Sequence, residues 1–147
     1  MTKDFTSYKP DDTKMKKLLL ILMLSLASNV FAQTVLTDKT FEKAINGRSA
    51  FSDDGSSIVV VEFWASFNDA NSFKGWENIK GVKYYRCDIS LSPEAKKNHK
   101  VRTIPHIVIF KDGYDEEHIK AGLDFAIDMT PSQLQEKINQ LINESKF

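Results

Sequence analysis

Cys87 is the only cysteine in the 147 residues, so its thiol is the only side chain that could carry out redox chemistry. A reactive thiolate needs access to solvent and a lowered pKa, as at a helix N-terminus. The sequence favours neither, because Cys87 alternates with Tyr85 and Ile89 as a buried residue of a strand does. We therefore expect an inert core thiol; the alternatives are a disulfide-linked dimer or a glutathionylated surface thiol.

Three histidines offer the other candidate chemistry, the binding of a metal ion. His99, His106 and His118 show no close ligand spacing with one another or with Cys87. Compact metal sites usually draw their ligands from such spacings, and histidines in loops are usually solvated. The sequence therefore predicts no metal site, and we expect no cofactor.

The strands that must position these residues follow from runs of apolar side chains. Residues 58–64 form a continuous β-branched and aromatic run, which is typical of a central strand covered on both faces. Residues 82–89 and 107–110 predict two further strands, and a turn signal at 111–113 leads to an expected edge strand at 118–123.

Amphipathic segments predict the helices between these strands. The expected helices are 38–45, 68–79, 93–100 and 130–144. Thr37 is expected to cap the first of them and Asn68 the second. Residues 47–57 are expected to form a loop. In the last helix Leu134, Ile138 and Leu141 fall on one face. Because strands and helices alternate along most of the chain, we predict an α/β fold.

The first 32 residues have the anatomy of a signal peptide. Basic residues at 14–17 precede the apolar run 18–26, and cleavage is expected after Ala32 to leave Gln33 as the first mature residue, with Met15 a possible true start. A membrane anchor is the alternative, but the apolar segment is about 15 residues long against the roughly 20 needed to span a bilayer. We expect one domain, residues 33–147, in the periplasm or secreted.

The charge balance argues against nucleic-acid binding. Lys and Arg total 20 and Asp and Glu total 20, so the chain has no field of one sign to attract a polyanion. For the same reason, contact with a membrane is expected only through an uncleaved leader.

Two segments resemble the thioredoxin family. One is Val60-Val61-Glu62-Phe63-Trp64-Ala65-Ser66-Phe67, which is similar to the strand and turn before the family's Cys-x-x-Cys motif, and the other is the segment 101–113, which resembles its cis-proline loop, next strand and hairpin. The last helix also fits, so the resemblance covers the chain from about Val35 onward. It implies a thioredoxin-like fold with a central mixed sheet flanked by helices.

The motif itself departs from the family. It reads Asn68-Asp69-Ala70-Asn71, and asparagine neither ionises near neutral pH nor forms a mixed disulfide, so this motif cannot exchange disulfides. Glu62 matches the family's buried acid, which serves proton transfer for the second cysteine. Without that cysteine we expect either a satisfied structural remnant or a pH-sensitive stability switch.

The resemblance further implies a binding face, because the family's cis-proline loop lies beside the motif and offers backbone groups to an extended polypeptide. The residues expected there are Trp64, Phe67, Asn68, Asp69, Asn71, Ile104, Pro105 and His106. The competing interpretation is that Pro105 only preserves a turn, and that Trp64 and Phe67 belong to the core.

Two classes of function follow. The first is a redox-inactive thioredoxin-like protein of the bacterial cell envelope that binds a polypeptide partner, as an adaptor or chaperone. The second is a thiol–disulfide oxidoreductase or redox-homeostasis protein that acts through Cys87 alone, which requires this thiol to be exposed and acidic. A structural module whose Asn68 and Asn71 only cap a helix is a third possibility.

Overall fold

The computed structural model describes residues 13, 16–17, 33–47 and 57–144. The chain divides into two units, Met1–Ala32 and Gln33–Phe147. Most of the expected leader, with Ala32 at its expected cleavage point, and most of the expected 47–57 loop lie outside the described residues. Within the part that is described, no helix has both the length and the apolar character needed to cross a membrane.

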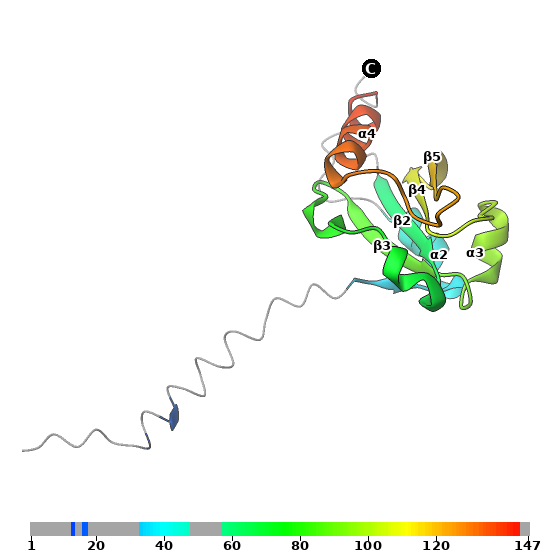
Figure 1. Ribbon diagram of the computed structural model, residues 1–147. Helices are drawn as coiled ribbons and strands as arrows, with labels where there is room; N and C mark the ends of the chain where they lie inside the picture. Colours follow the sequence, from blue (N-terminus) through cyan, green and yellow to red (C-terminus); the bar gives the residue numbers. More distant parts are fainter. Residues whose placement is uncertain (1–12, 14–15, 18–32, 48–56, 145–147) are drawn as a thin grey trace, which may run out of the picture. The chain divides into compact units, whose positions relative to one another are not determined.

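A mixed sheet forms the centre of the second unit (Figure 1). Its strands are β1 (Val35–Leu36), β2 (Ile58–Trp64), β3 (Lys83–Asp88), β4 (His106–Lys111) and β5 (Tyr114–Lys120). They lie in the order β1-β3-β2-β4-β5, with β3 parallel to both β1 and β2 and the other neighbours antiparallel. The predicted α/β architecture is confirmed.

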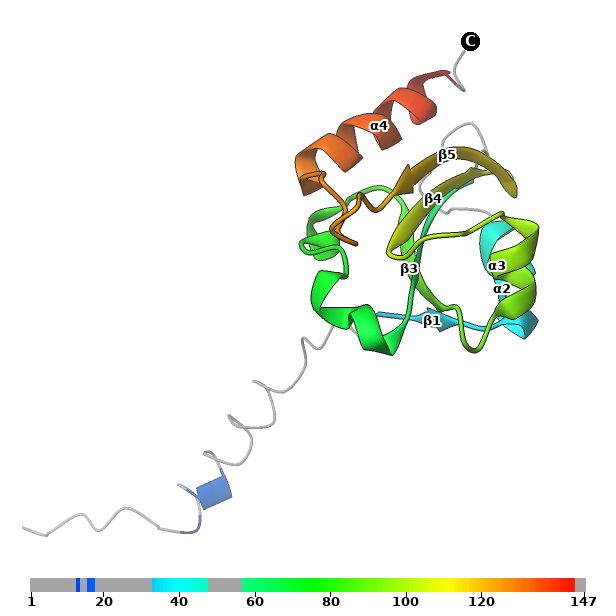
Figure 2. The same cartoon turned by 45° about the vertical axis from the view of Figure 1, so that its right-hand side comes forward.

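Helices cover both faces of this sheet. Buried residues of α2 (Asp38–Ile45) and α3 (Pro93–Asn98) pack against one face, and those of α4 (Pro131–Glu144) against the other. Figure 2 shows α2 and α3 side by side and α4 apart from them. Two short 3-10 segments, η1 (Ser66–Asn71) and η2 (Trp76–Asn78), connect β2 to β3.

The central strand β2 is buried along almost its whole length, as its continuous apolar run predicts. Val59, Val61 and Phe63 contribute to the core under α2 and α3, whereas Ile58 and Val60 contribute to the core under α4. Side chains of a strand alternate between its two faces, so a strand covered on both sides must be apolar throughout. Glu62 is the one charged exception in β2.

The prediction of a second α-helix over residues 68–79 is wrong. The chain forms η1 and η2 there, and Gly75 between them has φ +79°, a left-handed conformation that no α-helix continues through. A side chain at this position would also collide with Pro131, whose Cγ lies 2.6 Å from the place of a Cβ.

The other elements differ from the predictions mainly at their ends. The hairpin turn at Asp112 and Gly113 has two residues with positive φ, so β5 begins at Tyr114 and ends at Lys120 and does not occupy 118–123. The short strand β1 was missed, because two residues carry no periodicity. The capping box of Thr130 with Gln133 and the start of α4 at Pro131 agree with the predicted helix.

Candidate functional site

Asn68 and Asn71 lie in η1, directly after the central strand. The capping position of η1 is Ala65, so the expectation that Asn68 caps a helix is wrong. Asn68 instead sits inside the segment with φ −118° and ψ 21°, outside helical geometry.

The two amides form a small network that joins three segments. Asn71 Nδ2 donates a hydrogen bond to Asn68 Oδ1 at 2.8 Å, and Asn68 Nδ2 donates to the carbonyl oxygens of Ile104 at 3.1 Å and Phe125 at 3.3 Å. The peptide bond between Ile104 and Pro105 is cis. One backbone acceptor of the loop before Pro105 is thus already occupied by the protein's own side chain.

An apolar pocket of about 360 Å³ opens around this network. We call it the amide pocket, and it is lined by Phe67, Asn68, Asn71, Arg102, Thr103, Ile104 and Phe125. Phe67 is 83% exposed and Phe125 59% exposed, so two aromatic rings stand at the surface of the same pocket. The N–H groups of Thr103 and Ile104 form no hydrogen bond with another described residue.

Four of the eight residues predicted for the binding face do not line the amide pocket. Pro105 and His106 are buried, and the His106 ring contacts Phe63, so neither lines the amide pocket. Trp64 and Asp69 turn toward Arg86: the guanidinium carbon lies 3.8 Å from the Trp64 ring centroid, and Nη2 donates to Asp69 Oδ1 at 2.9 Å.

Three residues of the amide pocket were missed by the sequence analysis. Arg102 and Thr103 directly precede the predicted residue Ile104, and a wider view of that loop could have included them. Phe125 belongs to the connection after β5, and no local signal points to it, because only the folded chain brings it to Asn68.

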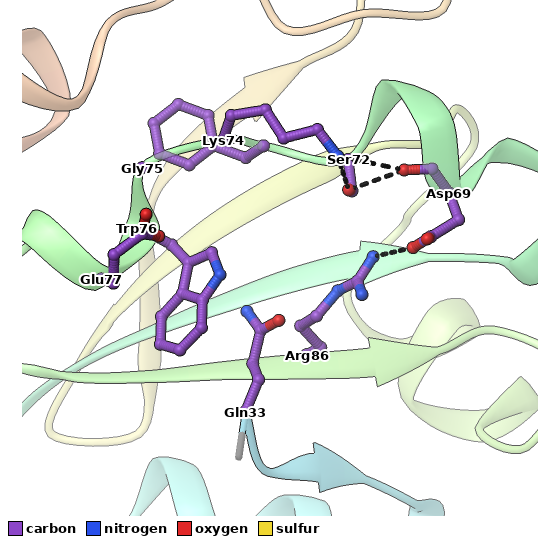
Figure 3. A pocket seen from close by; sticks show the side chains of 9 residues that line it. Gln33, Asp69, Ser72, Lys74, Gly75, Trp76, Glu77 and Arg86 are labelled. Carbon is purple, nitrogen blue, oxygen red and sulfur yellow. Dashed lines mark hydrogen bonds and ion pairs between the residues drawn. The ribbon is translucent and has the colours of Figure 1, made fainter. Parts of the chain in front are cut away.

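Arg86 borders a second pocket of about 360 Å³, which Figure 3 shows from close by. Gln33 and Trp76 point into the same hollow. Four of its polar side chains already bond to one another in pairs, because Arg86 pairs with Asp69 and Lys74 Nζ donates to Ser72 Oγ at 3.0 Å. It is therefore a weaker candidate for a binding site than the amide pocket.

Glu62 is fully buried, and protein groups contact both of its carboxylate oxygens. Oε1 accepts a hydrogen bond from the Phe73 N–H at 2.8 Å, while Oε2 accepts one from the Tyr84 hydroxyl at 3.2 Å and lies 3.5 Å from Arg86 Nε. Burial raises the pKa of Glu62, although the Phe73 N–H and Arg86 oppose this. Burial, together with the Glu62 charge, also raises the pKa of Tyr84. The site is satisfied, and Glu62 ties the chain after η1 to the sheet.

Cys87 lies in the core, as the strand alternation predicts. It is fully buried between Leu36 of β1 and Phe63 of β2, its partners in the sheet register. Burial raises the pKa of the Cys87 thiol to about 11. An oxidoreductase acting through Cys87 requires an exposed thiol with a lowered pKa, so the structure gives that alternative no support.

The three histidines lie near one another and near Asp115. His106 Nε2 is 2.9 Å from His118 Nδ1, and Asp115 Oδ2 lies 3.3 Å from His118 Nε2 and 3.4 Å from His99 Nδ1. The prediction of solvated histidines is wrong for His99 and His106, which are buried. Among the described residues, no three His, Cys, Asp or Glu side chains are placed to hold a metal ion.

No family model and no curated protein sequence matches this chain. Solved structures do match. A mutant thioredoxin from Halobacterium salinarum is 14% identical with a TM-score of 0.55, over 74% of this chain and 88% of that one. Mitochondrial thioredoxin 3 from Saccharomyces cerevisiae, in its oxidised form, is 23% identical with a TM-score of 0.52, over 74% and 95%.

A third match comes from a structure on the thiol-resolving mechanism of a yeast mitochondrial 1-Cys peroxiredoxin via glutathione/thioredoxin systems. It is 22% identical with a TM-score of 0.52, over 74% of this chain and 95% of that chain. At these identities the matches establish the fold, and the chain is thioredoxin-like in its architecture.

Proposed function

We propose that this thioredoxin-fold chain is a redox-inactive protein of the cell envelope that binds a polypeptide partner at the amide pocket, as an adaptor or chaperone. The observation that carries the proposal is the pair of exposed rings, Phe67 and Phe125, at the edge of an apolar pocket. Exposed aromatic side chains gathered at one pocket are typical of surfaces that bind a partner.

The main chain beside the pocket supports a polypeptide as the partner. The N–H groups of Thr103 and Ile104, without partners among the described residues, can pair with the backbone of an extended segment. The Ile104 carbonyl is held by Asn68, so such pairing at this residue would use the N–H only or displace the amide. Affinity would then come from apolar side chains in the pocket together with a few backbone hydrogen bonds.

Redox inactivity rests on the placement of the side chains. The accessible positions 68 and 71 hold amides, which neither ionise near neutral pH nor attack a disulfide. The only sulfur that could do so, Cys87, is buried. An insulin-reduction assay with dithiothreitol should therefore show no acceleration over buffer, and a clear rate enhancement would contradict the proposal.

The location in the cell envelope rests on the leader alone. Mass spectrometry of protein isolated from the periplasmic fraction is expected to find an N-terminus at Gln33. A protein that retains residues 16–32 would instead favour the alternative that the leader is an uncleaved membrane anchor.

Binding can be tested with an unfolded model polypeptide, such as reduced and carboxymethylated lactalbumin, in a fluorescence titration. The double variant Phe67→Ser/Phe125→Ser is expected to weaken binding at least ~10-fold, because it removes both exposed rings. Tyr114→Ser is the matched control: Tyr114 is 74% exposed and starts β5, at the end of the hairpin far from Pro105. Equal affinity of the wild type, the double variant and the Tyr114→Ser control would contradict the assignment of the binding site to the amide pocket.

A further inference from the structure

A group of basic side chains lies next to the amide pocket, and we call it the basic patch. It consists of Lys96 and Lys97 of α3 together with Lys100 and Arg102 of the chain that follows. With Pro93 and Val101 these four line a pocket of about 440 Å³. No acidic residue lines this pocket, and none occurs in the sequence between Glu94 and Asp112.

The four cations have no ion-pair partner among the described residues. This contrasts with Arg86, which pairs with Asp69, and with Lys137, which pairs with Glu117. Like charges held close together repel, and an anionic partner would relieve that repulsion. The basic patch therefore gathers four positive charges that form no ion pair with a described residue, although the whole chain carries no net formal charge.

Arg102 connects the two surfaces, because it lines both the basic patch pocket and the amide pocket. Thr103 and Ile104 follow it directly, and these are the residues whose N–H groups lack partners among those described. One continuous stretch of chain, 100–104, thus carries two positive charges, two backbone N–H groups without partners among the described residues, and part of the lining of the amide pocket. An extended ligand lying along this stretch meets all three.

We propose that the partner bound at the amide pocket is an acidic polypeptide segment, which places an apolar side chain in the amide pocket and aspartate or glutamate residues on the basic patch. This inference rests on the proposed function. A nucleic acid or an anionic membrane would also supply negative charge. The observations favour a polypeptide, because the adjoining pocket is apolar and the backbone donors between the two surfaces fit a peptide main chain.

The test uses three fluorescent peptides that share one apolar core and differ only in flanks of Asp/Glu, Ser/Gly or Lys/Arg. At about 50 mM salt the acidic peptide is expected to bind at least ~10-fold more tightly than the neutral one, and this advantage should largely disappear at about 500 mM, because salt screens exposed charges. Binding of the acidic and neutral peptides with equal affinity would overturn the inference while leaving the proposed function intact. No binding by any peptide would overturn both.

A charge-reversed variant assigns the effect to the patch. Lys97→Glu/Lys100→Glu is expected to lower the affinity for the acidic peptide at least ~10-fold and to change the affinity for the neutral peptide by no more than about 2-fold. Its affinity for the basic peptide should rise. Lys80→Glu/Lys83→Glu makes the same change in net charge at two exposed lysines outside both pockets and should have little effect. If the control variant lowers the affinity for the acidic peptide equally, the acidic flanks do not bind specifically at the basic patch.

The same proteins distinguish the other polyanions. Sedimentation with vesicles containing phosphatidylserine and titration with a single-stranded oligonucleotide are expected to show binding at least ~10-fold weaker than that of the acidic peptide. If the vesicles or the oligonucleotide bind more tightly than the acidic peptide, and Lys97→Glu/Lys100→Glu abolishes that binding, the partner of the basic patch is that polyanion and not an acidic polypeptide.

Discussion

The amide pocket and the strands beneath it contain opposite kinds of residues. The pocket presents amides, two exposed phenylalanines and Arg102, and none of these side chains is a nucleophile. The buried strands contain Cys87, Glu62 and His106, each fully buried and each with a shifted pKa. Reactive groups are thus found where no ligand can reach them, and the accessible surface is suited to binding.

This separation shows why a shared fold is weak evidence for a shared activity. The sheet, the cis peptide bond before Pro105 and the helices are present, but chemistry depends on which side chains are accessible. Four experiments can break or sharpen the contrast, and we give them from the largest expected effect to the smallest.

The largest effect concerns the reactivity of Cys87. With a pKa of about 11, the thiol is ionised to roughly one part in a thousand at pH 8, against about a quarter for a free thiol. Because burial adds the cost of opening the core, alkylation by iodoacetamide is expected to be more than ~1,000-fold slower in the native protein than in denaturant. Fast labelling of the native protein below pH 7 would break the contrast and restore Cys87 as a redox candidate.

The converse experiment puts thiols on the accessible side. The side chains of Asn68 and Asn71 already meet, at 2.8 Å, so Asn68→Cys/Asn71→Cys is expected to form an intramolecular disulfide, seen as a loss of two hydrogens by mass spectrometry. When reduced, these thiols should alkylate at least ~100-fold faster than Cys87 in the same molecule.

Insulin reduction by this double variant is nevertheless expected to stay slow. The six-residue segment η1 is a 3-10 helix, which offers less stabilisation to a thiolate than the N-terminus of a long α-helix. Rapid insulin reduction would show that the missing helix is not what limits the scaffold. Failure to form the disulfide would contradict the expectation that positions 68 and 71 lie close enough to be bridged.

His106 predicts a loss of stability in acid. Burial, together with His118 and Lys120, lowers the pKa of His106 to about 4, below its ordinary value of 6.5. The unfolded chain therefore takes up a proton first as the pH falls, and the free energy of unfolding should decrease by ~3 kcal/mol between pH 6.5 and 4. His106→Phe retains ring packing against Phe63 and should lack this component in urea titrations at each pH. An unchanged slope would contradict the burial of His106.

Glu62 predicts a smaller effect of opposite sign. Its pKa is raised in the folded state, so its contribution to stability is fully present below the unfolded pKa of about 4.5 and decreases as the pH rises through the folded pKa. Glu62→Gln should remove this decrease, which is at most about 1.4 kcal/mol per pH unit. Measuring both proteins in the His106→Phe background removes the His106 ionisation and so isolates the Glu62 component. Glu136→Gln, at an exposed position, is the control and should retain the wild-type slope.

Local patterns predicted most of the fold. The run at 58–64 corresponds to β2, the capping signals before residues 38 and 131 correspond to α2 and α4, and the Asp112-Gly113 signal corresponds to the hairpin turn. Each depends on neighbours within a few positions of the chain. The 68–79 helix failed because the left-handed Gly75, packed against Pro131, is a tertiary feature.

Of the site, the sequence determined its chemistry, and only the tertiary structure decided its access. Residue types alone establish that positions 68 and 71 carry amides and that the chain has one thiol. Long-range packing places Cys87 and His106 under the surface, and it brings Phe125 to Asn68 across 57 positions of the chain. Burial and long-range contacts depend on how strands and loops assemble, and no local spacing records them.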